Sequence, residues 1–350
     1  MSFKLGATIL AFVGAVAVST ANAQEIPKRE FRGVASFSSS PVYSTRAKPF
    51  WEEQVKEESN GQITAELMTI DQLGFKGEEV FRMVKLGLFD FVTNVMSFAA
   101  GDDPRNEALD LAGVVPDIDG LHAMADAYRP VLKDLFASKY QLKMMGTWPI
   151  GPVVVWCNSP VTSVADLKEK KVRGFNRAMA DFLEGAGAVP VSMSFGDMVT
   201  GLERGTVDCA ITSPRSGLKA GLAEVTTHIL PVTLGWAMVF DGFNSKTWNA
   251  LDESTQQLLE KEYAKLEEKT YANVREETED AYRCLQGQTP CNDPGSMRDP
   301  LVVTPLSDAD KAEVKRITEE VVLPRWAERC GEECVTKYKE TVGSVVDAKL

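Results

Sequence analysis

The stretch EVFRMVKLGLFDFVT at residues 79–93 recurs as DMVTGLERGTVDCAI at residues 197–211, and the two copies align without a gap. Each copy begins with apolar residues at helical spacing. Each then has a glycine, Gly87 or Gly205, where a helix can end in a left-handed conformation. Three residues after each glycine, an aspartate precedes a short apolar run that is typical of a buried strand. The repeat predicts two copies of one helix–strand unit; chance similarity is the alternative.

The flanks of the two copies repeat as well. The strand pattern FRGVASF, a helical segment of about residues 43–58 and the strand pattern QITAELM precede the first copy. KKVRGF, a helical segment of about residues 177–185 and AVPVSMS precede the second. Each half therefore has the order strand, helix, strand, helix, strand, which predicts a parallel or mixed sheet with helices on both faces. Ligands of such sheets bind beyond the carboxyl ends of the strands, so two facing lobes would form a binding cleft.

These patterns predict an α/β protein of the two-lobed periplasmic-binding-protein architecture, with a cleft between the lobes. We assign residues 24–149 to lobe I and residues 150–236 to lobe II, and we expect the chain to return to lobe I at residues 237–251. The remaining residues, 252–350, are predicted to form helices.

The first of these helices is predicted to be unusually long. Asp252 is a suitable N-cap, and apolar residues recur every three or four positions from Leu259 to Leu285. At a rise of 1.5 Å per residue such a helix would be roughly 50 Å long, so we expect it to span both lobes. Ser307 and Asp310 indicate the start of a last helix, which is predicted to end near Pro324.

Residues 1–23 have the features of a secretory signal peptide. Lys4 precedes an apolar run at residues 5–18, and the segment ends in the small-x-small sequence Ala21-Asn22-Ala23. A membrane anchor is the alternative, but a spanning helix needs about 20 apolar residues. We therefore expect cleavage after Ala23 and export to the periplasm.

The charge balance disfavours some classes of partner. The formal net charge is −12, and loss of the +1 of Lys4 would leave the mature chain at −13. Such a chain is repelled by nucleic acids and by anionic membrane surfaces, so we predict neither as a partner. An anionic ligand would have to be captured by local positive charge.

The chain contains six cysteines, which in an exported protein favour disulfides. Two pairs are close in sequence and are predicted to form local disulfides: Cys284 with Cys291, and Cys330 with Cys334. A zinc site of four thiolates is the alternative for these four residues. Cys157 and Cys209 lie in strand-like runs, and the sequence leaves open whether they are free thiols or a pair.

The sequence gives little sign of catalysis. His122 and His228 are the only histidines, and neither lies in a metal-ligand spacing or near a nucleophile motif. We therefore predict that the protein is not an enzyme and needs no cofactor or metal. A periplasmic hydrolase that acts through carboxylates remains the alternative, because acidic residues are too numerous to exclude by spacing.

The strongest candidate ligand contact is Arg173, at the end of the predicted strand KKVRGF. A guanidinium there could hold a carboxylate through two parallel hydrogen bonds, although a surface arginine is the alternative. Other candidates are polar or aromatic residues after predicted strands, or large aromatics near the predicted lobe crossings. They are Ser39, Ser40, Tyr43, Asn94, Ser97, Phe98, Phe175, Thr212, Ser213, Trp148, Trp236 and Phe240. Serine and threonine also form turns, and large aromatics are more often buried in the core.

Four segments in order resemble one known family. They are FWEEQVKEESNGQITAELMTIDQLG, SVADLKEKKVRGF, GAVPVSMSFGDMVTGLERGTVDCA and FNSKTWNAL. Together they are similar to the solute receptors of TRAP (tripartite ATP-independent periplasmic) transporters, of the C4-dicarboxylate-receptor type, over essentially the whole mature chain. The resemblance implies two lobes that close over a ligand, a long helix across both, and Arg173 as a carboxylate clamp. It also implies an organic acid as ligand and two membrane permease subunits as partners.

The chain departs from that family pattern at two places. A second arginine, frequent in the family on the strand aligned with GPVVVWCN, is replaced by apolar residues from Val153 to Trp156. Ile211-Thr212-Ser213-Pro214 replaces a more familiar acid or asparagine. The favoured ligand is therefore a monocarboxylate with an apolar or aromatic body, packed on Trp236, Phe240 or Trp148, unless the other lobe supplies a second charge. The alternatives are a receptor for another transport or sensory system, or a structural envelope protein. A monomer is expected, with a dimer as the alternative.

Overall fold

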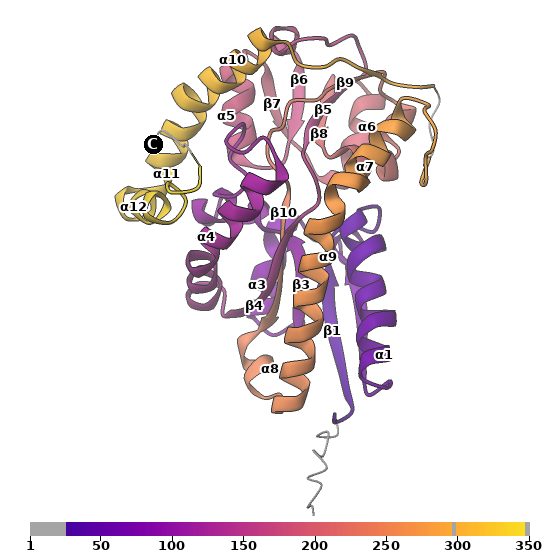
Figure 1. Ribbon diagram of the computed structural model, residues 1–350, viewed down its shortest axis with the longest axis vertical. Helices are drawn as coiled ribbons and strands as arrows, with labels where there is room; N and C mark the ends of the chain where they lie inside the picture. The colour runs from indigo at the N-terminus through magenta and orange to yellow at the C-terminus, as the bar shows by residue number, and fades with distance from the viewer. Residues whose placement is uncertain (1–25, 296–298, 347–350) are drawn as a thin grey trace, which may run out of the picture.

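Two β-sheets, one in each lobe, organise the molecule (Figure 1). The computed structural model describes residues 26–295 and 299–346. The sheet of lobe I has the order β2 (Ile63–Thr69), β1 (Arg29–Ala35), β3 (Phe91–Val95), β10 (Met238–Asn244) and β4 (Leu142–Pro149). The sheet of lobe II has the order β11 (Val302–Val303), β9 (His228–Leu230), β5 (Val154–Cys157), β8 (Cys209–Thr212), β6 (Lys171–Gly174) and β7 (Val189–Ser192). Both sheets are mixed, which confirms the predicted two-lobed α/β fold.

The repeat seen in the sequence is a repeat in the structure. α3 (Val80–Lys85) leads to β3, and α6 (Met198–Glu203) leads to β8. Gly87 and Gly205 have φ angles of 79° and 66°, in the left-handed region that glycine adopts readily. The carboxylates of Asp90 and Asp208 each accept a hydrogen bond of 2.8 Å from a backbone N–H of the neighbouring strand, at Arg32 and Lys171 respectively. Aspartates at equivalent positions of the repeat thus connect equivalent pairs of strands in the two lobes.

Helices cover both faces of the lobe I sheet, and the side chains of β10, which alternate between the two faces, contact the helices on each side. Phe240 stacks on Phe136 of α4 (Ile118–Ser138), with ring centroids 3.6 Å apart. Phe243 points to the other face, where its ring lies 6.4 Å from that of Tyr263 in α9 (Glu253–Leu285). The helical segment before β2 packs on that same face through Phe50, 4.4 Å from Tyr263. This segment comprises η1 (Val42–Ala47), η2 (Phe50–Val55) and α1 (Lys56–Glu58), where one helix was predicted.

Two neighbouring chain segments join the lobes. One runs from β4 to β5 and the other from β9 to β10, and they are hydrogen-bonded to each other, for example from Val153 N to the carbonyl of Gly235 at 2.9 Å. Gly151 and Gly235 have φ angles of 147° and 124°, and Ala237 has a φ of 49°. The paired crossings therefore contain backbone conformations that most residues avoid, next to the space between the lobes.

The helix α9 is the predicted long helix, with 33 residues, and Asp252 accepts the hydrogen bond of the Thr255 N–H as its N-cap. It packs against β4 in lobe I and against α7 (Pro214–Ala220) in lobe II, so it spans both lobes (Figure 1). Three further α-helices are α2 (Ile70–Leu73), α5 (Arg177–Gly185) and α8 (Ser245–Asn249).

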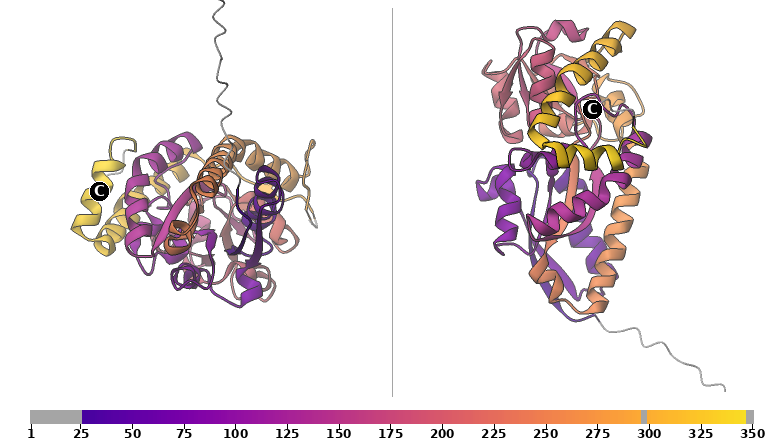
Figure 2. Two further views of the ribbon diagram at one scale, coloured as in Figure 1. Left: turned by 90° about the horizontal axis from the view of Figure 1, so that it is seen from below. Right: turned by 90° about the vertical axis from the view of Figure 1, so that its left-hand side faces the viewer.

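The chain ends in helices that also connect the lobes (Figure 2). α10 (Asp308–Ile317) is capped by Ser307 as predicted, but the prediction that this helix ends near Pro324 is wrong. A π-helical turn at Thr318–Val322 leads directly into α11 (Leu323–Cys330), so the helical segment continues past Pro324. α12 (Glu332–Thr341) then packs against α4 of lobe I.

Three disulfides link the six cysteines: Cys284–Cys291, Cys330–Cys334 and Cys157–Cys209. The first two are the local pairs that the spacing favours, and the third joins the neighbouring strands β5 and β8. Within the described part of the chain, no helix has both the length and the hydrophobicity that a membrane crossing requires. The predicted signal peptide lies outside the described residues.

Candidate functional site

A small cavity lies between the lobes at the strand ends, and we call it the chamber. Its volume is about 20 Å³. Lobe I contributes Ser36, Phe37, Ser40, Val95 and Phe98, and the lobe crossings contribute Ile150 and Ala237. Lobe II contributes Arg173, Phe175, Phe195, Thr212, Ser213 and Ser216. Apart from the crossing residues, they lie at or after the carboxyl ends of β1, β3, β6, β7 and β8, so the chamber occupies the place where open α/β sheets bind ligands.

Arg173 is the only ionisable side chain among the described residues that line the chamber, and it is 1% exposed. Its Nε donates a hydrogen bond of 2.9 Å to the carbonyl of Met193, and its Nη1 donates one of 2.9 Å to the carbonyl of Ile211. Its guanidinium also lies 5.3 Å from the centre of the Phe175 ring. In the described part of the chain, Nη2 has no hydrogen-bond partner and the guanidinium has no ion pair.

This environment makes the charged form of Arg173 costly. Burial lowers the pKa of Arg173 to about 9, and the charge of Asp197 partly opposes that shift. Buried charges in proteins are normally paired. A guanidinium that is oriented by two carbonyl groups, with a free edge and no acidic partner, is therefore suited to an anion from outside the chain.

The structure brings six of the predicted ligand contacts together around the chamber. They are Ser40, Phe98, Arg173, Phe175, Thr212 and Ser213. The Ser213 hydroxyl already accepts the hydrogen bond of the Ser216 N–H at the start of α7. Its position in the chamber wall therefore has a structural reason besides ligand contact.

Four other predicted polar contacts lie outside the chamber. Ser97 lines a second, wider groove between the lobes, which is described below. Its hydroxyl donates a hydrogen bond of 2.9 Å to the carboxylate of Asp110. The amide of Asn94 is directed to the carbonyl of Gly77, at 3.0 Å. Ser39 is exposed and Tyr43 is half-buried, and neither belongs to the chamber wall.

The three large aromatics predicted to pack on the ligand lie in the core of the molecule instead, and their positions do not support that role. Trp148 donates from Nε1 to the carboxylate of Asp241 at 2.5 Å, a buried acid whose pKa burial raises to about 7. Trp236 donates from Nε1 to the carbonyl of Val115 at 2.9 Å. Phe240 stacks under the sheet on α4. Both indole N–H groups have hydrogen-bond acceptors within the protein, and the ring of Phe240 is packed against another ring of the core.

Seven wall residues were not predicted: Ser36, Phe37, Val95, Ile150, Phe195, Ser216 and Ala237. Ser36 and Phe37 follow the strand β1 directly, so the rule that led to Ser39 and Ser40 could have found them. Phe195 follows β7, a strand end from which no candidate was taken. Ile150 and Ala237 reach the chamber only because the lobe crossings pass beside it.

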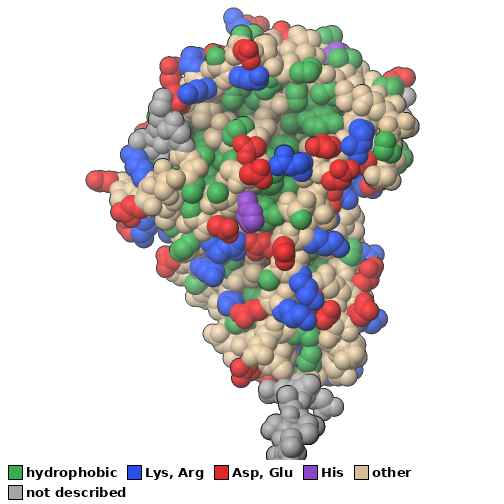
Figure 3. Space-filling view, in the orientation of Figure 1, with side chains coloured by type: hydrophobic (Ala, Val, Ile, Leu, Met, Phe, Trp, Pro, Cys, Tyr) green, Lys and Arg blue, Asp and Glu red, His purple; other side chains and the backbone are tan. Residues whose placement is uncertain are grey.

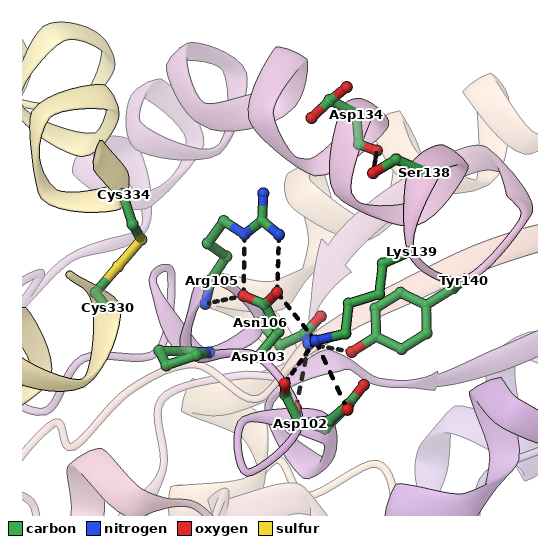
Figure 4. A network of polar contacts seen from close by, with 12 residues as sticks. Asp102, Asp103, Arg105, Asn106, Asp134, Ser138, Lys139, Tyr140, Cys330 and Cys334 are labelled. Atoms are coloured by element: carbon green, nitrogen blue, oxygen red, sulfur yellow. Dashed lines mark hydrogen bonds and ion pairs between the residues drawn. A yellow bond between two sulfur atoms is a disulfide. The ribbon is translucent and has the colours of Figure 1, made fainter. Parts of the chain in front are cut away.

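A wider groove of about 860 Å³ also lies between the lobes, and we call it the outer groove. Its wall includes the basic residues Arg82, Lys85, Lys139 and Arg177 and the acidic residues Glu78, Glu79 and Asp102. Lys139 Nζ donates to the carbonyl of Asp102 at 2.6 Å and lies 3.2 Å from the carboxylate of Asp103 (Figure 4). The described residues on the face drawn in Figure 3 likewise show charges of both signs interspersed. The uncompensated buried charge therefore lies in the chamber and not in the outer groove.

Comparison with known proteins agrees with this architecture. Residues 34–323 match the model of the bacterial extracellular solute-binding proteins, family 7. The chain is 25% identical over 207 residues to the ectoine-binding periplasmic protein TeaA of Halomonas elongata, a match that covers 57% of this chain and 60% of that protein. The sequence match thus spans about three fifths of the length of that relative.

Solved structures resemble the fold over nearly its whole length. The extracytoplasmic solute receptor DctP6 of Bordetella pertussis, which binds pyroglutamic acid, superimposes with a TM-score of 0.79 at 20% identity, over 90% of this chain and 100% of that one. A TRAP solute-binding protein of Desulfovibrio salexigens with bound orotic acid gives a TM-score of 0.77 at 20% identity, over 91% and 100%. The family consists of transport receptors and not of enzymes. The chain belongs to family 7 of the bacterial extracellular solute-binding proteins, the solute receptors of TRAP transporters.

Proposed function

We propose that this protein is a periplasmic receptor that binds an organic monocarboxylate between its lobes and delivers it to a TRAP membrane permease. The observation that carries the proposal is the buried guanidinium of Arg173, which has a free edge and no acidic partner. A carboxylate that accepts hydrogen bonds from this edge would supply the missing negative charge. Family membership supports the same role, because its members are transport receptors.

The chamber wall supports a ligand with one negative charge and an apolar or aromatic body. Four phenylalanines surround the space: Phe37, Phe98, Phe175 and Phe195. Arg173 is the sole charged group of the described wall, so a second carboxylate would be left unpaired, and so would the ammonium of an amino acid. Pyroglutamic acid and orotic acid, which bind to the two structurally similar receptors, each carry one carboxylic acid on a ring.

The size of the chamber supports coupling between binding and lobe movement. A cavity of about 20 Å³ has room for little more than one water molecule. A ligand of several heavy atoms therefore fits only if the lobes move apart around it. Because the ligand contacts both lobes, it changes the distribution of lobe arrangements in proportion to its differential affinity. A permease could distinguish a loaded receptor from an empty one in this way.

A thermal-shift screen of organic acids tests the ligand class. The panel pairs each monocarboxylate, including benzoate-type acids, with its neutral amide, a related dicarboxylate and a related amino acid. We expect some monocarboxylates to raise the melting temperature, because a ligand at 100 times its Kd adds about 2.7 kcal/mol to the stability. The amides, dicarboxylates and amino acids should give much smaller shifts. Equal stabilisation by an acid and its amide, or stabilisation by dicarboxylates alone, would contradict the proposal.

The partner and the compartment are tested separately. Mature protein recovered from the periplasm with Gln24 at its N-terminus would support the export proposal, and protein that retains Lys4 would contradict it. Transport of the ligand should require both this receptor and two membrane permease subunits. Ligand-dependent kinase activity without transport would instead favour a sensory receptor.

A further inference from the structure

The chamber and the outer groove are separated by two aromatic side chains. Among the described residues, only Phe98 and Phe175 line both spaces. Phe98 belongs to lobe I, where it lies in the 3₁₀ turn Met96–Ala99 directly after β3. Phe175 belongs to lobe II and follows the last residue of β6. The boundary between the two spaces is therefore made jointly by the lobes.

The two rings are in contact across the lobes. Their centroids are 5.7 Å apart and their planes are nearly perpendicular, at 84°. This edge-to-face arrangement is a favourable one for aromatic pairs. Phe37 extends the contact on the chamber side, because its ring lies 6.3 Å from that of Phe98 and 5.7 Å from that of Phe195.

Both rings are held in place from behind. A Cβ atom added at Gly77 would lie 2.4 Å from Cδ2 of Phe98, so the bare backbone of Gly77 forms the surface on which this ring rests. The Asn94 amide fixes that backbone through its hydrogen bond to the Gly77 carbonyl. Phe175 is placed by the guanidinium of Arg173, which is itself oriented by two carbonyl groups. The pair is therefore built into the fold on each side.

We propose that Phe98 and Phe175 form a length filter that makes the receptor selective for short carboxylates. The inference rests on the proposed function, in which the carboxylate of the ligand is held by Arg173. A ligand anchored there extends towards this pair. A short body needs only a small separation of the lobes and ends before the two rings, which still close the chamber. A longer body has to pass between the rings and opens the chamber to the water of the outer groove. The higher dielectric then weakens the ion pair with Arg173, so affinity falls with ligand length.

The filter is tested with two homologous series of acids on the mature chain. One series contains benzoate, phenylacetate, 3-phenylpropionate and 4-phenylbutyrate, and the other contains straight-chain carboxylates from acetate to decanoate. Calorimetry gives the Kd of each acid for the wild type, for Phe98→Ala and for Phe175→Leu. We expect the wild type to prefer short members in the series that binds. Either substitution should shift the ratio of long-acid to short-acid affinity at least tenfold towards the long acids.

Phe195→Ala is the matched control, because Phe195 lines the chamber but not the outer groove. It should weaken short and long acids alike and leave their ratio unchanged. Gly77→Ala tests the support of Phe98 and should change the ratio without removing any ring. A uniform loss of affinity in Phe98→Ala and Phe175→Leu, like that of the control, would overturn the filter while leaving the carboxylate receptor intact. A wild type that binds neither series would overturn the proposed ligand class, and the filter with it.

Discussion

Arg173 occupies a position that is unfavourable for a charged group in the absence of an anion. The side chain is 1% exposed, and the described residues offer it two carbonyl oxygens and an aromatic face but no carboxylate within ion-pair distance. Dipoles of this kind orient a guanidinium without neutralising it. We therefore propose that the unpaired charge serves to bind an anion, because perturbed ionisable groups in clefts are often functional.

The pKa of Arg173 predicts the pH dependence of ligand binding. Burial lowers this pKa to about 9 in the free receptor, whereas a bound carboxylate would raise it again. Binding energy from the ion pair is thus fully present below pH 9 and is lost as the pH rises above it. We expect a nearly constant affinity between pH 6 and 8, and a fall of up to about tenfold per pH unit above pH 9. Calorimetric titrations from pH 6 to 10.5 measure this, and a flat profile to pH 10.5 would contradict it.

Single residues of the chamber wall were predictable only where position and chemistry agreed. Arg173 was found because its charge stands out at a strand end, and Phe98, Phe175 and Thr212 because they follow predicted strands. The aromatics at the lobe crossings could not be placed in this way. Whether such a ring faces the cleft or the core depends on which face of its strand is covered by a helix, as α4 covers Phe240.

At the scale of elements, α9 connects the lobes through one carboxylate. Glu277 accepts hydrogen bonds of 2.6 Å from Nη2 of Arg46 in lobe I, and it forms an ion pair with Arg215 of α7 in lobe II. The three side chains are between 16% and 23% exposed. Arg46 and Arg215 lie in the helical segments that begin beside Ser40 and Ser213 of the chamber wall. This cluster therefore ties the helix to both walls.

Replacement of Glu277 by glutamine should lower the free energy of unfolding by about 1–3 kcal/mol, because two arginines lose their shared partner. This magnitude lies between those of exposed and buried ion pairs. Chemical denaturation followed by circular dichroism measures the change. Glu276→Gln is the matched control, since Glu276 is the preceding residue of the same helix and its side chain is 70% exposed. It should change the stability by less than about 0.5 kcal/mol. Equal effects of the two substitutions would show that Glu277 contributes no more than a surface pair.

The elements themselves were predictable where the chain carries a local signal. The repeat placed α3, β3, α6 and β8, and the periodicity from Leu259 to Leu285 placed α9. Pro324 was misread as a helix end, because a proline usually interrupts a helical pattern, whereas here a π-helical turn precedes it and the helical segment continues. The pairing of Cys157 with Cys209 was equally undetermined, since it depends on the register of β5 against β8.

At the scale of the whole molecule, the chamber that we propose as the binding site exists only where the lobes meet. Lobe I supplies apolar and hydroxyl groups, and lobe II supplies the guanidinium. Two hydrogen-bonded crossings with glycines at positive φ, the helix α9 and the C-terminal helices all connect the lobes. No local sequence pattern specifies how far apart these connections hold the lobes. The architecture was therefore predictable from the repeat, whereas the shape and size of the chamber were not.

The most direct measurement compares Arg173→Gln with Arg177→Gln and with the wild type, by calorimetry with the acid that most stabilises the wild type in the screen. Arg177 is an exposed arginine that lines the outer groove and serves as the matched control. If Arg173 holds the carboxylate of the ligand, Arg173→Gln should lose about 2–5 kcal/mol of binding free energy, as expected when one member of a buried charge pair is removed. Arg177→Gln should bind within about threefold of the wild type, since an exposed charge contributes about 0–1 kcal/mol. Binding of the acid by a folded Arg173→Gln variant with wild-type affinity would contradict the account.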